Sequence, residues 1–325
     1  MPNISYNDSS LTYIGRWTDY GTSMGSNWQG SQIRFKVSGS LNLNVNVDVK
    51  DIDGTISQTG VVLNIDGANF AQVITTTVAD IYTGAKTANF TLPDTDEHTI
   101  IMKVYAWPEQ QWDETGYCRL NSFDINAGGS VNTWDKFGGY RVGFVGDSWM
   151  AVFHDWPFLM TQEKYWPYFI SYGGAKAAPL NSKIDYDNPT TLNTDDPVLD
   201  IIIVNSSIND YNAGVTLSAF NTSFASLVDK LRAQQPTAKI ILLQSPRNTT
   251  HSKNYDQYGP EMDSIALTRS NVEYVACPSS LWSSLTWLAD TAHLDYASRQ
   301  IFADFVEGEV NALVSNKRIF ACILY

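Results

Sequence analysis

The chain has 325 residues, a length that predicts two domains at about 100–200 residues per domain. Hydrophobic residues make up 43% of it and charged residues 17%, so the sequence can form a real core and is unlike a disordered chain. The formal net charge of -13 argues against nucleic acid and membranes as partners, because an acidic surface repels the phosphates of nucleic acid and of anionic lipids.

Residues 1–127 are predicted to form an all-β sandwich. Between Leu41 and Val49, apolar residues alternate with asparagine and aspartate, which is the period-two pattern of a strand with one buried face. Many short strands with turns between them are typical of two packed antiparallel sheets. Further strands, separated by turn-forming residues, are expected at Gly60–Ile65, Phe70–Thr75, Ala88–Leu92 and Thr99–Tyr105.

Residues 128–139 are rich in glycine and are predicted to be a linker. Residues 140–325 are predicted to form an α/β domain, in which a parallel sheet lies between helices. Apolar residues recur every three or four positions from Leu217 to Leu231 and from Ile301 to Leu313, which predicts a helix in each segment. The strands are expected at Arg141–Val145, Leu199–Val204, Lys239–Leu243 and Asn271–Ala276.

A Gly146-Asp147-Ser148 turn directly follows the first strand of the α/β domain. Ligands of open α/β sheets bind beyond the carboxyl ends of the strands, so Ser148 lies where a nucleophile would lie. A serine hydroxyl needs a base within hydrogen-bond reach, and that base needs a partner that orients it. Asp290 precedes His293 by three residues, close enough on a tight loop to bind the far ring nitrogen. Taken alone, each motif could equally be an ordinary turn.

Two further motifs can supply hydrogen-bond donors to an oxyanion. Asn209 follows the apolar strand Leu199–Val204, where its side-chain N–H groups can stabilise negative charge on a substrate oxygen. Gly173 and Gly174 follow the aromatic stretch Tyr165–Phe169, and a glycine lets a backbone N–H approach the same oxygen because no Cβ intervenes.

The order of these motifs resembles that of the SGNH (GDSL-type) hydrolase family over about residues 140–315. The resemblance implies a three-layer α/β domain in which Ser148 is the nucleophile, His293 the base and Asp290 the partner of the base. Gly174 is favoured over Gly173 because a small residue follows it. The implied oxyanion hole consists of the N–H of Ser148, the N–H of Gly174 and the side chain of Asn209.

Three residues depart from the pattern of that family, but none of them removes a catalytic atom. Ser207 and Ser298 stand where the family often has glycine, and Trp149 replaces the leucine that follows the nucleophile. Trp149 is the candidate substrate-binding residue, a flat apolar wall that would shorten the acyl pocket; a position in the core is the alternative.

The remaining histidines are weaker candidates for a base. His98 falls in the predicted sandwich and is expected at the surface. His154 follows the nucleophile by six residues, where a structural role is favoured. His251 falls in the polar segment Asn248–Tyr258, which we expect to be a solvated loop.

The N-terminal segment resembles the jelly-roll domain that precedes an SGNH domain in two-domain carbohydrate esterases. The resemblance rests on Tyr13–Trp17, Trp28–Ser31, Ile33–Val37 and Gly39. It implies contact with a carbohydrate, and the 10 Trp and 17 Tyr of the chain suit this because flat rings stack on sugar faces. The alternative for each aromatic residue is packing in the core or between the domains.

Together these features predict a serine esterase that removes O-acetyl groups from a glycan. Its expected partner is an acetylated polysaccharide or oligosaccharide, and the chemistry requires no cofactor and no metal. Two alternatives stay open: a glycan-binding structural protein of a virus particle that has lost its activity, and a lipase or thioesterase on the same fold.

The N-terminus lacks the basic segment and apolar core of a secretory signal peptide. Few lysines and abundant Asn, Ser, Thr and Gly suit a component of a phage particle, such as a tail protein. We therefore expect a virion-associated protein, extracellular after lysis, that acts on the surface polysaccharide of the host and contacts further copies of itself or other virion proteins. A cytoplasmic esterase is the alternative.

Overall fold

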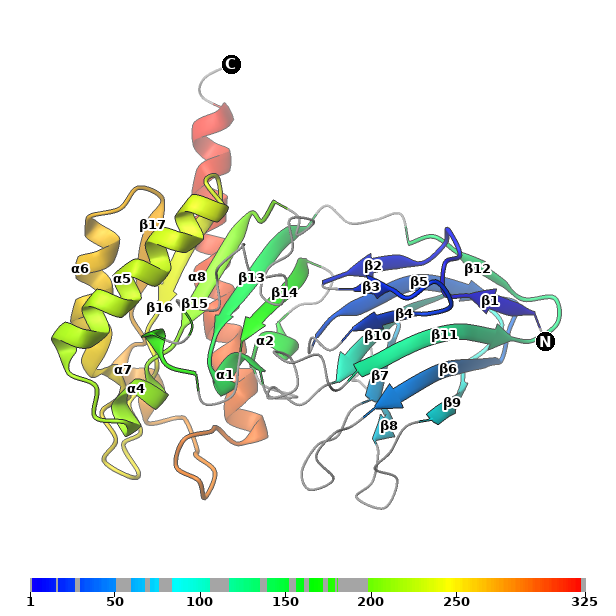
Figure 1. The fold of residues 1–325 in the computed structure, drawn as a ribbon, viewed down its shortest axis with the longest axis horizontal. Coiled ribbons are helices and arrows are strands. Elements are labelled where there is room, and N and C mark those ends of the chain that lie inside the picture. The colour runs from blue at the N-terminus through cyan, green and yellow to red at the C-terminus, as the bar shows by residue number, and fades with distance from the viewer. Residues whose placement is uncertain are drawn as a thin grey trace.

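The protein consists of a β-sandwich and an α/β domain that lie side by side (Figure 1). The computed structural model describes residues 2–15, 17–26, 30–50, 60–67, 71–75, 84–105, 117–134, 139–151, 156–160, 164–171, 175–178, 180 and 198–322. None of the helices within these ranges is long and apolar enough to cross a bilayer.

The sandwich is built from two antiparallel sheets. In the described ranges, one sheet has the order β3-β4-β11-β6-β9 with β1 paired to β11, and the other has the order β12-β5-β10-β7-β8 with β2 paired to β5. The strands are β1 (Asn3–Ser5), β2 (Thr12–Ile14), β3 (Thr18–Asp19), β4 (Met24–Ser26), β5 (Gln32–Ser38), β6 (Asn42–Lys50), β7 (Gly60–Ile65), β8 (Ala71–Thr75), β9 (Gly84–Thr91), β10 (His98–Tyr105), β11 (Tyr117–Ile125) and β12 (Ser130–Asn132).

Alternation of side chains along the strands produces the sandwich core. On β6, Leu43, Val45 and Val47 are fully buried, and the asparagines between them lie outside the core. The core residues of β5 and β10 alternate in the same way and face those of β6 and β11 across the sandwich. The sandwich predicted from this periodicity is therefore confirmed. Residue 70, which belongs to one predicted strand, falls outside the described ranges.

The segment predicted as a linker contains a strand, which corrects the prediction for that part of residues 128–139. Strand β12 lies within it and pairs with β5, so that Val131 lies opposite Val37. Gly128 has a φ of 92°, the left-handed conformation that a turn into the new strand requires. Gly128 and Gly129 therefore lie in a tight turn between β11 and β12.

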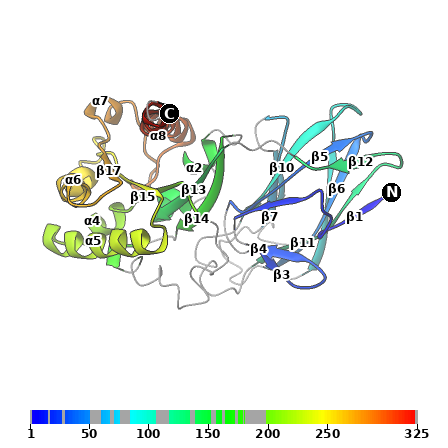
Figure 2. The same cartoon turned by 90° about the horizontal axis from the view of Figure 1, so that it is seen from above.

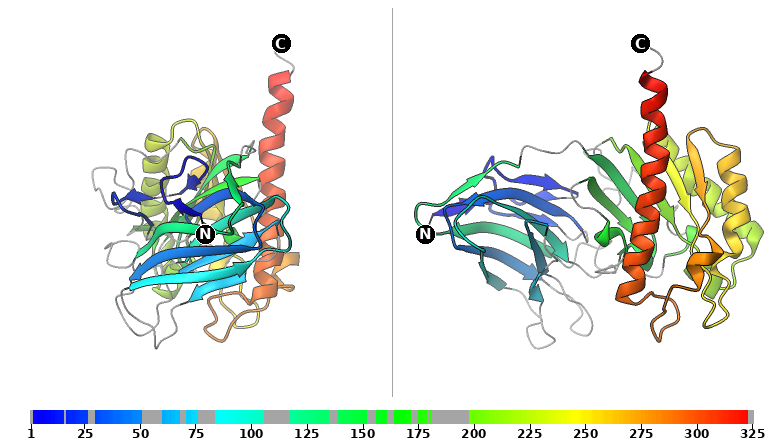
Figure 3. Two further views of the ribbon diagram at one scale, coloured as in Figure 1. Left: turned by 90° about the vertical axis from the view of Figure 1, so that its right-hand side faces the viewer. Right: turned by 180° about the vertical axis from the view of Figure 1, so that it is seen from behind.

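The α/β domain has one parallel sheet of five described strands in the order β14-β13-β15-β16-β17. Helices α5 and α6 cover one face of the sheet and α8 covers the other (Figure 2). The C-terminal part of α8 extends past the rest of the domain (Figure 3). The elements are β13 (Tyr140–Gly146), α1 (Ser148–Ala151), α2 (Trp156–Leu159), β14 (Tyr165–Ser171), β15 (Ile201–Asn205), α4 (Ile208–Asn212), α5 (Leu217–Gln234), β16 (Lys239–Leu243), η2 (Tyr255–Tyr258), α6 (Gly259–Leu267), β17 (Val272–Val275), α7 (Ser279–Trp282) and α8 (Tyr296–Cys322).

Burial on both faces explains why the central strands are apolar without interruption. On β15, Ile202 and Val204 pack in the cluster formed with α5, whereas Ile201 and Ile203 pack in the cluster formed with α8. A strand that alternates between two buried faces needs an apolar residue at each position. The predicted parallel sheet with helices on both faces is confirmed.

Direct contacts join the sandwich to β14, the edge strand of the parallel sheet. Gly30 has a φ of 81°, and a Cβ at this position would lie 2.1 Å from the ring of Phe169. The buried Arg34 guanidinium donates to the carbonyl oxygen of Tyr165 at 3.0 Å. Ile14 of β2 is fully buried in the same cluster as residues of β14. The two domains therefore share one packed interface.

His98 is buried rather than at the surface, which corrects the sequence-based expectation. Its Nδ1 lies 2.6 Å from a carboxylate oxygen of Asp66, and its Nε2 lies 3.2 Å from one of Asp94. The hydrogen bond to Asp66 raises the pKa of His98, although burial opposes the shift. Burial works against the charge on Asp66 as well, but the bonds from His98 and Thr99 outweigh it and lower the pKa of that carboxyl group.

We expect His98→Gln to lower the free energy of unfolding more at about pH 5.5 than at about pH 9. Because the folded-state pKa of His98 is raised, the stabilisation is complete below the unfolded value of ~6.5 and is lost as the pH rises through the folded value. Urea denaturation of both proteins at the two pH values measures the difference. An equal loss at both values would contradict the ion pair.

Candidate active site

The nucleophile turn begins where β13 ends. Gly146 is required there, because a Cβ would lie 2.1 Å from the backbone oxygen of Asn205 on the neighbouring strand. Asp147 is buried and accepts the backbone N–H of Trp149 at 3.0 Å, which shapes the turn into α1. Ser148 is half-buried at the start of α1, at the carboxyl end of the parallel sheet.

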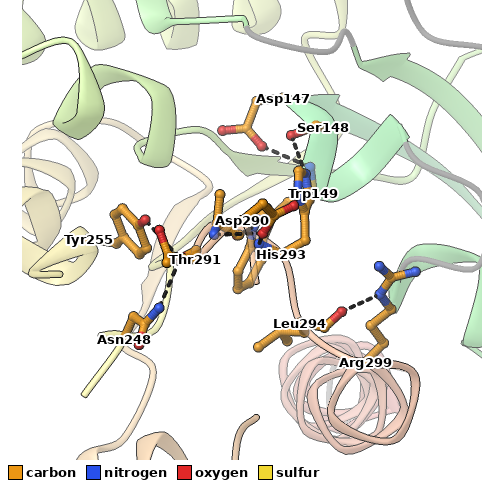
Figure 4. A network of polar contacts seen from close by, with 11 residues as sticks. Asp147, Ser148, Trp149, Asn248, Tyr255, Asp290, Thr291, His293, Leu294 and Arg299 are labelled. Atoms are coloured by element: carbon orange, nitrogen blue, oxygen red, sulfur yellow. Dashed lines mark hydrogen bonds and ion pairs between the residues drawn. The ribbon is translucent and has the colours of Figure 1, made fainter. Parts of the chain in front are cut away.

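A continuous chain of hydrogen bonds joins three of the predicted site residues. The distance from Asp290 Oδ2 to His293 Nδ1 is 2.7 Å, and that from His293 Nε2 to Ser148 Oγ is 2.8 Å. Figure 4 shows His293 between the other two side chains. A serine hydroxyl, an imidazole and a carboxylate in this order form the arrangement that activates a serine nucleophile.

The electrostatics of Asp290 favour its charged form. Partial burial opposes ionisation, but the hydrogen bond from the His293 ring outweighs it and lowers the pKa of Asp290. The backbone N–H groups of Ala292 and His293 also donate to Oδ1, at 2.9 and 3.0 Å. The carboxylate is therefore fixed by three donors and can orient the imidazole and stabilise it when it is protonated.

Asn209 lies at the carboxyl end of β15, where the sequence places it. Its side-chain N–H donates to the backbone oxygen of Ala175 at 3.1 Å. Gly174, the predicted backbone donor, and its alternative Gly173 both lie outside the described residues. An amide nitrogen carries two hydrogens, so the bond to Ala175 leaves one for a substrate oxygen. The oxyanion hole stays a prediction.

Ser207 and Ser298, which stand where the SGNH pattern often has glycine, both form hydrogen bonds. The Ser207 hydroxyl donates to the hydroxyl of Ser245 at 2.8 Å. The Ser298 hydroxyl accepts the backbone N–H of Thr286 at 2.7 Å. These bonds hold the loop after β15 and the loop before α8, so the departures from the pattern have a structural use.

Trp149 belongs to the core, and this corrects its predicted role as a substrate-binding wall. Its side chain is 1% exposed and packs edge-to-face against Phe302, with ring centroids 5.6 Å apart. The indole N–H donates to the backbone oxygen of Ala292. A ring this buried offers almost no surface to a substrate, because α8 and the loop before it cover it.

Sequence reasoning missed three buried polar residues near the site. Asp210 accepts the backbone N–H of Ala177, and Asn248 and Tyr255 both donate to the backbone oxygen of Thr291. Asp210 directly follows Asn209 and could have been noticed there. The other two fall in the segment expected to be a solvated loop, where no periodicity marks them.

The other histidines take no part in the described site. His154 lies outside the described residues. His251 is exposed and its backbone N–H donates to the side chain of Asn248. No three His, Cys, Asp or Glu side chains in the described ranges are close enough together to hold a metal ion.

The fold is shared with solved structures of carbohydrate esterases. A family two carbohydrate esterase from Clostridium thermocellum in complex with cellohexaose superimposes with a TM-score of 0.72 and 14% identity, over 94% of this chain and 99% of that one. An acetyl xylan esterase from the rumen bacterium Butyrivibrio proteoclasticus has a TM-score of 0.71 and 13% identity, over 97% and 100% of the chains. The chain has the two-domain fold of these esterases.

The same fold also carries a related chemistry. A salicylyl-acyltransferase from a tetracycline biosynthetic pathway has a TM-score of 0.67 and 15% identity, over 96% of this chain and 98% of that one. No protein-family model and no curated protein matches the sequence. The predicted architecture, a β-sandwich followed by an α/β domain with a parallel sheet between helices, is confirmed by these likenesses in fold.

We expect Asp210→Asn to stabilise the protein at about pH 8, by up to about 3 kcal/mol, and to stabilise it by only about 1 kcal/mol at about pH 4.5. Burial raises the pKa of Asp210 to about 6, above its unfolded value, so that ionisation of this carboxyl group destabilises the fold as the pH rises. Asparagine keeps an oxygen for the Ala177 N–H but carries no charge.

Urea denaturation of Asp210→Asn at both pH values measures this effect. The matched control is Asp229→Asn, which removes an exposed carboxylate paired with Arg269 and should not stabilise the protein. Equal changes at the two pH values in Asp210→Asn would contradict the role of charge.

Proposed function

We propose that the protein is a serine esterase that removes acetyl groups, or other short acyl groups, from the hydroxyls of a glycan. The observation that carries the proposal is the hydrogen-bond chain from Asp290 through His293 to Ser148. The fold shared with carbohydrate esterases supports a glycan ester as the substrate.

In the first half of the reaction, the acyl group moves to the enzyme. Ser148 Oγ attacks the ester carbonyl carbon while His293 Nε2 takes the hydroxyl proton. Negative charge develops on the carbonyl oxygen, next to the N–H of Ser148 and the side chain of Asn209. The bond to the sugar oxygen then breaks, and His293 gives its proton to that oxygen as the sugar leaves.

In the second half, water releases the acyl group. His293 takes a proton from the water, whose oxygen attacks the acyl-Ser148 carbonyl. Acetate leaves when the bond to Ser148 Oγ breaks, and the proton returns to that oxygen. Asp290 stabilises the protonated imidazole in both halves and takes no proton itself.

Two other functions fit the same fold less well. A binding protein without activity has no need of a nucleophile, base and carboxylate at distances of 2.7 and 2.8 Å. A lipase or thioesterase needs a long apolar channel beside the nucleophile, which substrates of different acyl length can reveal. For localisation, composition favours a phage particle whose esterase acts on the surface polysaccharide of the host.

We expect Ser148→Ala to lower kcat on p-nitrophenyl acetate by several orders of magnitude, because removing one member of the triad disables the whole unit. The thermal midpoints of the two proteins should agree within a few degrees, since only one hydroxyl is lost. Steady-state kinetics and a thermal melt measure the two quantities. Near-native activity in the variant would rule out this site.

We expect activity on p-nitrophenyl esters to fall from acetyl to octanoyl. Each extra CH2 would add about 0.8 kcal/mol of binding if an apolar channel were present to receive it. A deacetylase gains nothing from these groups and has to exclude them. Values of kcat/KM across the series measure the profile, and a rise with acyl length would favour the lipase.

A further inference from the structure

The base of the proposed triad lies at the end of a strained turn. Thr291 has a φ of 63°, a left-handed conformation that β-branched residues rarely adopt. The turn is closed by a bond from the Thr291 N–H to the Leu288 oxygen at 2.9 Å and one from the Leu288 N–H to the His293 oxygen at 2.7 Å. Thr291 lies between Asp290 and His293 in the chain, and the bond between those two side chains forms with Thr291 in this conformation. Other contacts must therefore stabilise the strained backbone at Thr291.

Two buried side chains bind the carbonyl at the strained position. Asn248 Nδ2 donates to the Thr291 oxygen at 2.8 Å, and the Tyr255 hydroxyl donates to the same atom at 3.0 Å. Both residues follow β16, and their exposed fractions are 0% and 1%. Figure 4 shows the two donors converging on this oxygen. Two donors occupy both lone pairs of the carbonyl, which fixes the orientation of the peptide group.

A third buried donor binds the next carbonyl along the chain. The indole N–H of Trp149 donates to the backbone oxygen of Ala292. Trp149 itself directly follows the nucleophile Ser148 in the sequence. The ring is wedged against Trp287 and Phe302, so it has little freedom to move. Trp149 therefore ties the loop of the base to the turn that carries Ser148.

We propose that Trp149, Asn248 and Tyr255 are positioning residues that hold His293 at hydrogen-bond distance from Ser148. We call the three donors and the two carbonyls of Thr291 and Ala292 the carbonyl clamp. None of the three touches a reacting atom; they act through the backbone of the loop. The inference rests on the proposed function, since it concerns the geometry of the same triad.

The test uses Tyr255→Phe and Trp149→Phe in the full chain. Tyr255→Phe removes one hydroxyl and keeps the ring contacts to Tyr211 and Trp287. Asn248 is left unchanged because its Oδ1 also accepts the N–H of His251. The matched control is Tyr258→Phe, which removes an equally buried hydroxyl that donates to the Val215 oxygen at 2.7 Å on the opposite face of the sheet.

Each clamp variant should lower kcat for p-nitrophenyl acetate about threefold to tenfold, the scale of one lost hydrogen bond, and change KM by less than twofold. The downfield proton resonance of His293 Nδ1–H, which reports the bond to Asp290, should weaken or disappear. Tyr258→Phe should lower the thermal midpoint about as much as Tyr255→Phe does, but it should leave kcat and the His293 resonance unchanged.

A second substitution tests the strain directly. Asparagine adopts the left-handed conformation more readily than threonine, so Thr291→Asn in the Tyr255→Phe background should recover part of the lost kcat and of the resonance. A merely structural effect of Tyr255 on packing would not be recovered by a substitution that only eases the backbone strain at Thr291.

The two proposals can fail separately. The rate at which an organophosphonate labels Ser148 reports the triad without any glycan, and the proton resonance reports it without any reaction. If the protein is labelled but cleaves no acetyl ester, the proposed substrate is wrong and the clamp is still tested. The clamp is overturned if both variants keep the labelling rate, kcat and resonance of the unaltered protein.

Discussion

A hydrogen bond of 2.8 Å between His293 and Ser148 joins side chains that lie 145 residues apart in the chain. Hydrogen bonds weaken steeply when their length or angle departs from the preferred range, so two separate loops must each be fixed to within a few tenths of an ångström. Much of the α/β domain can be understood as the two supports of this one contact.

The first support is the parallel sheet. Strand β13 is held by a neighbour on each side and packed on both faces, and it ends in a glycine that fits against the backbone of β15. The nucleophile turn therefore starts from one of the most constrained points of the domain. A nucleophile placed on such a turn needs no large rearrangement before it reacts.

The second support is the loop before α8, which has no regular structure of its own. An isolated bridge between Trp287 and Leu294 closes it at the base, and the Ser298 hydroxyl binds Thr286 beside the bridge. Buried side chains from two other parts of the chain bind its carbonyls. These hydrogen bonds stabilise the loop in the way that pairing with β14 and β15 stabilises β13.

The sandwich contributes to the same framework through the edge of the sheet. Lys164 and Tyr165 are consecutive residues of the chain, and the Lys164 carbonyl bonds to β13, so the Tyr165 carbonyl points to the open edge. Arg34 of the sandwich binds that carbonyl at 3.0 Å. The N-terminal domain thus covers this edge of the sheet, next to the strand that leads to the nucleophile.

The sequence by itself determined the features that depend on local pattern. Alternation along Leu41–Val49 and the apolar run at β15 identified strands and their burial, because side-chain period and residue type are set within a few positions. The order of the motifs identified Ser148, Asp290 and His293, whose contact the structure shows. Strands as short as β12 carry no such pattern, because they exist only through their neighbours.

Only the tertiary structure decided how these residues are surrounded. Trp149 looks like a pocket wall from its place beside Ser148, yet α8 and the loop of the base bury it. Asn248 and Tyr255 look like loop residues, yet both hold the backbone beside the base. The reason is that burial and hydrogen-bond partners depend on segments tens to hundreds of residues away in the chain. The local sequence does not specify which of these segments will pack together.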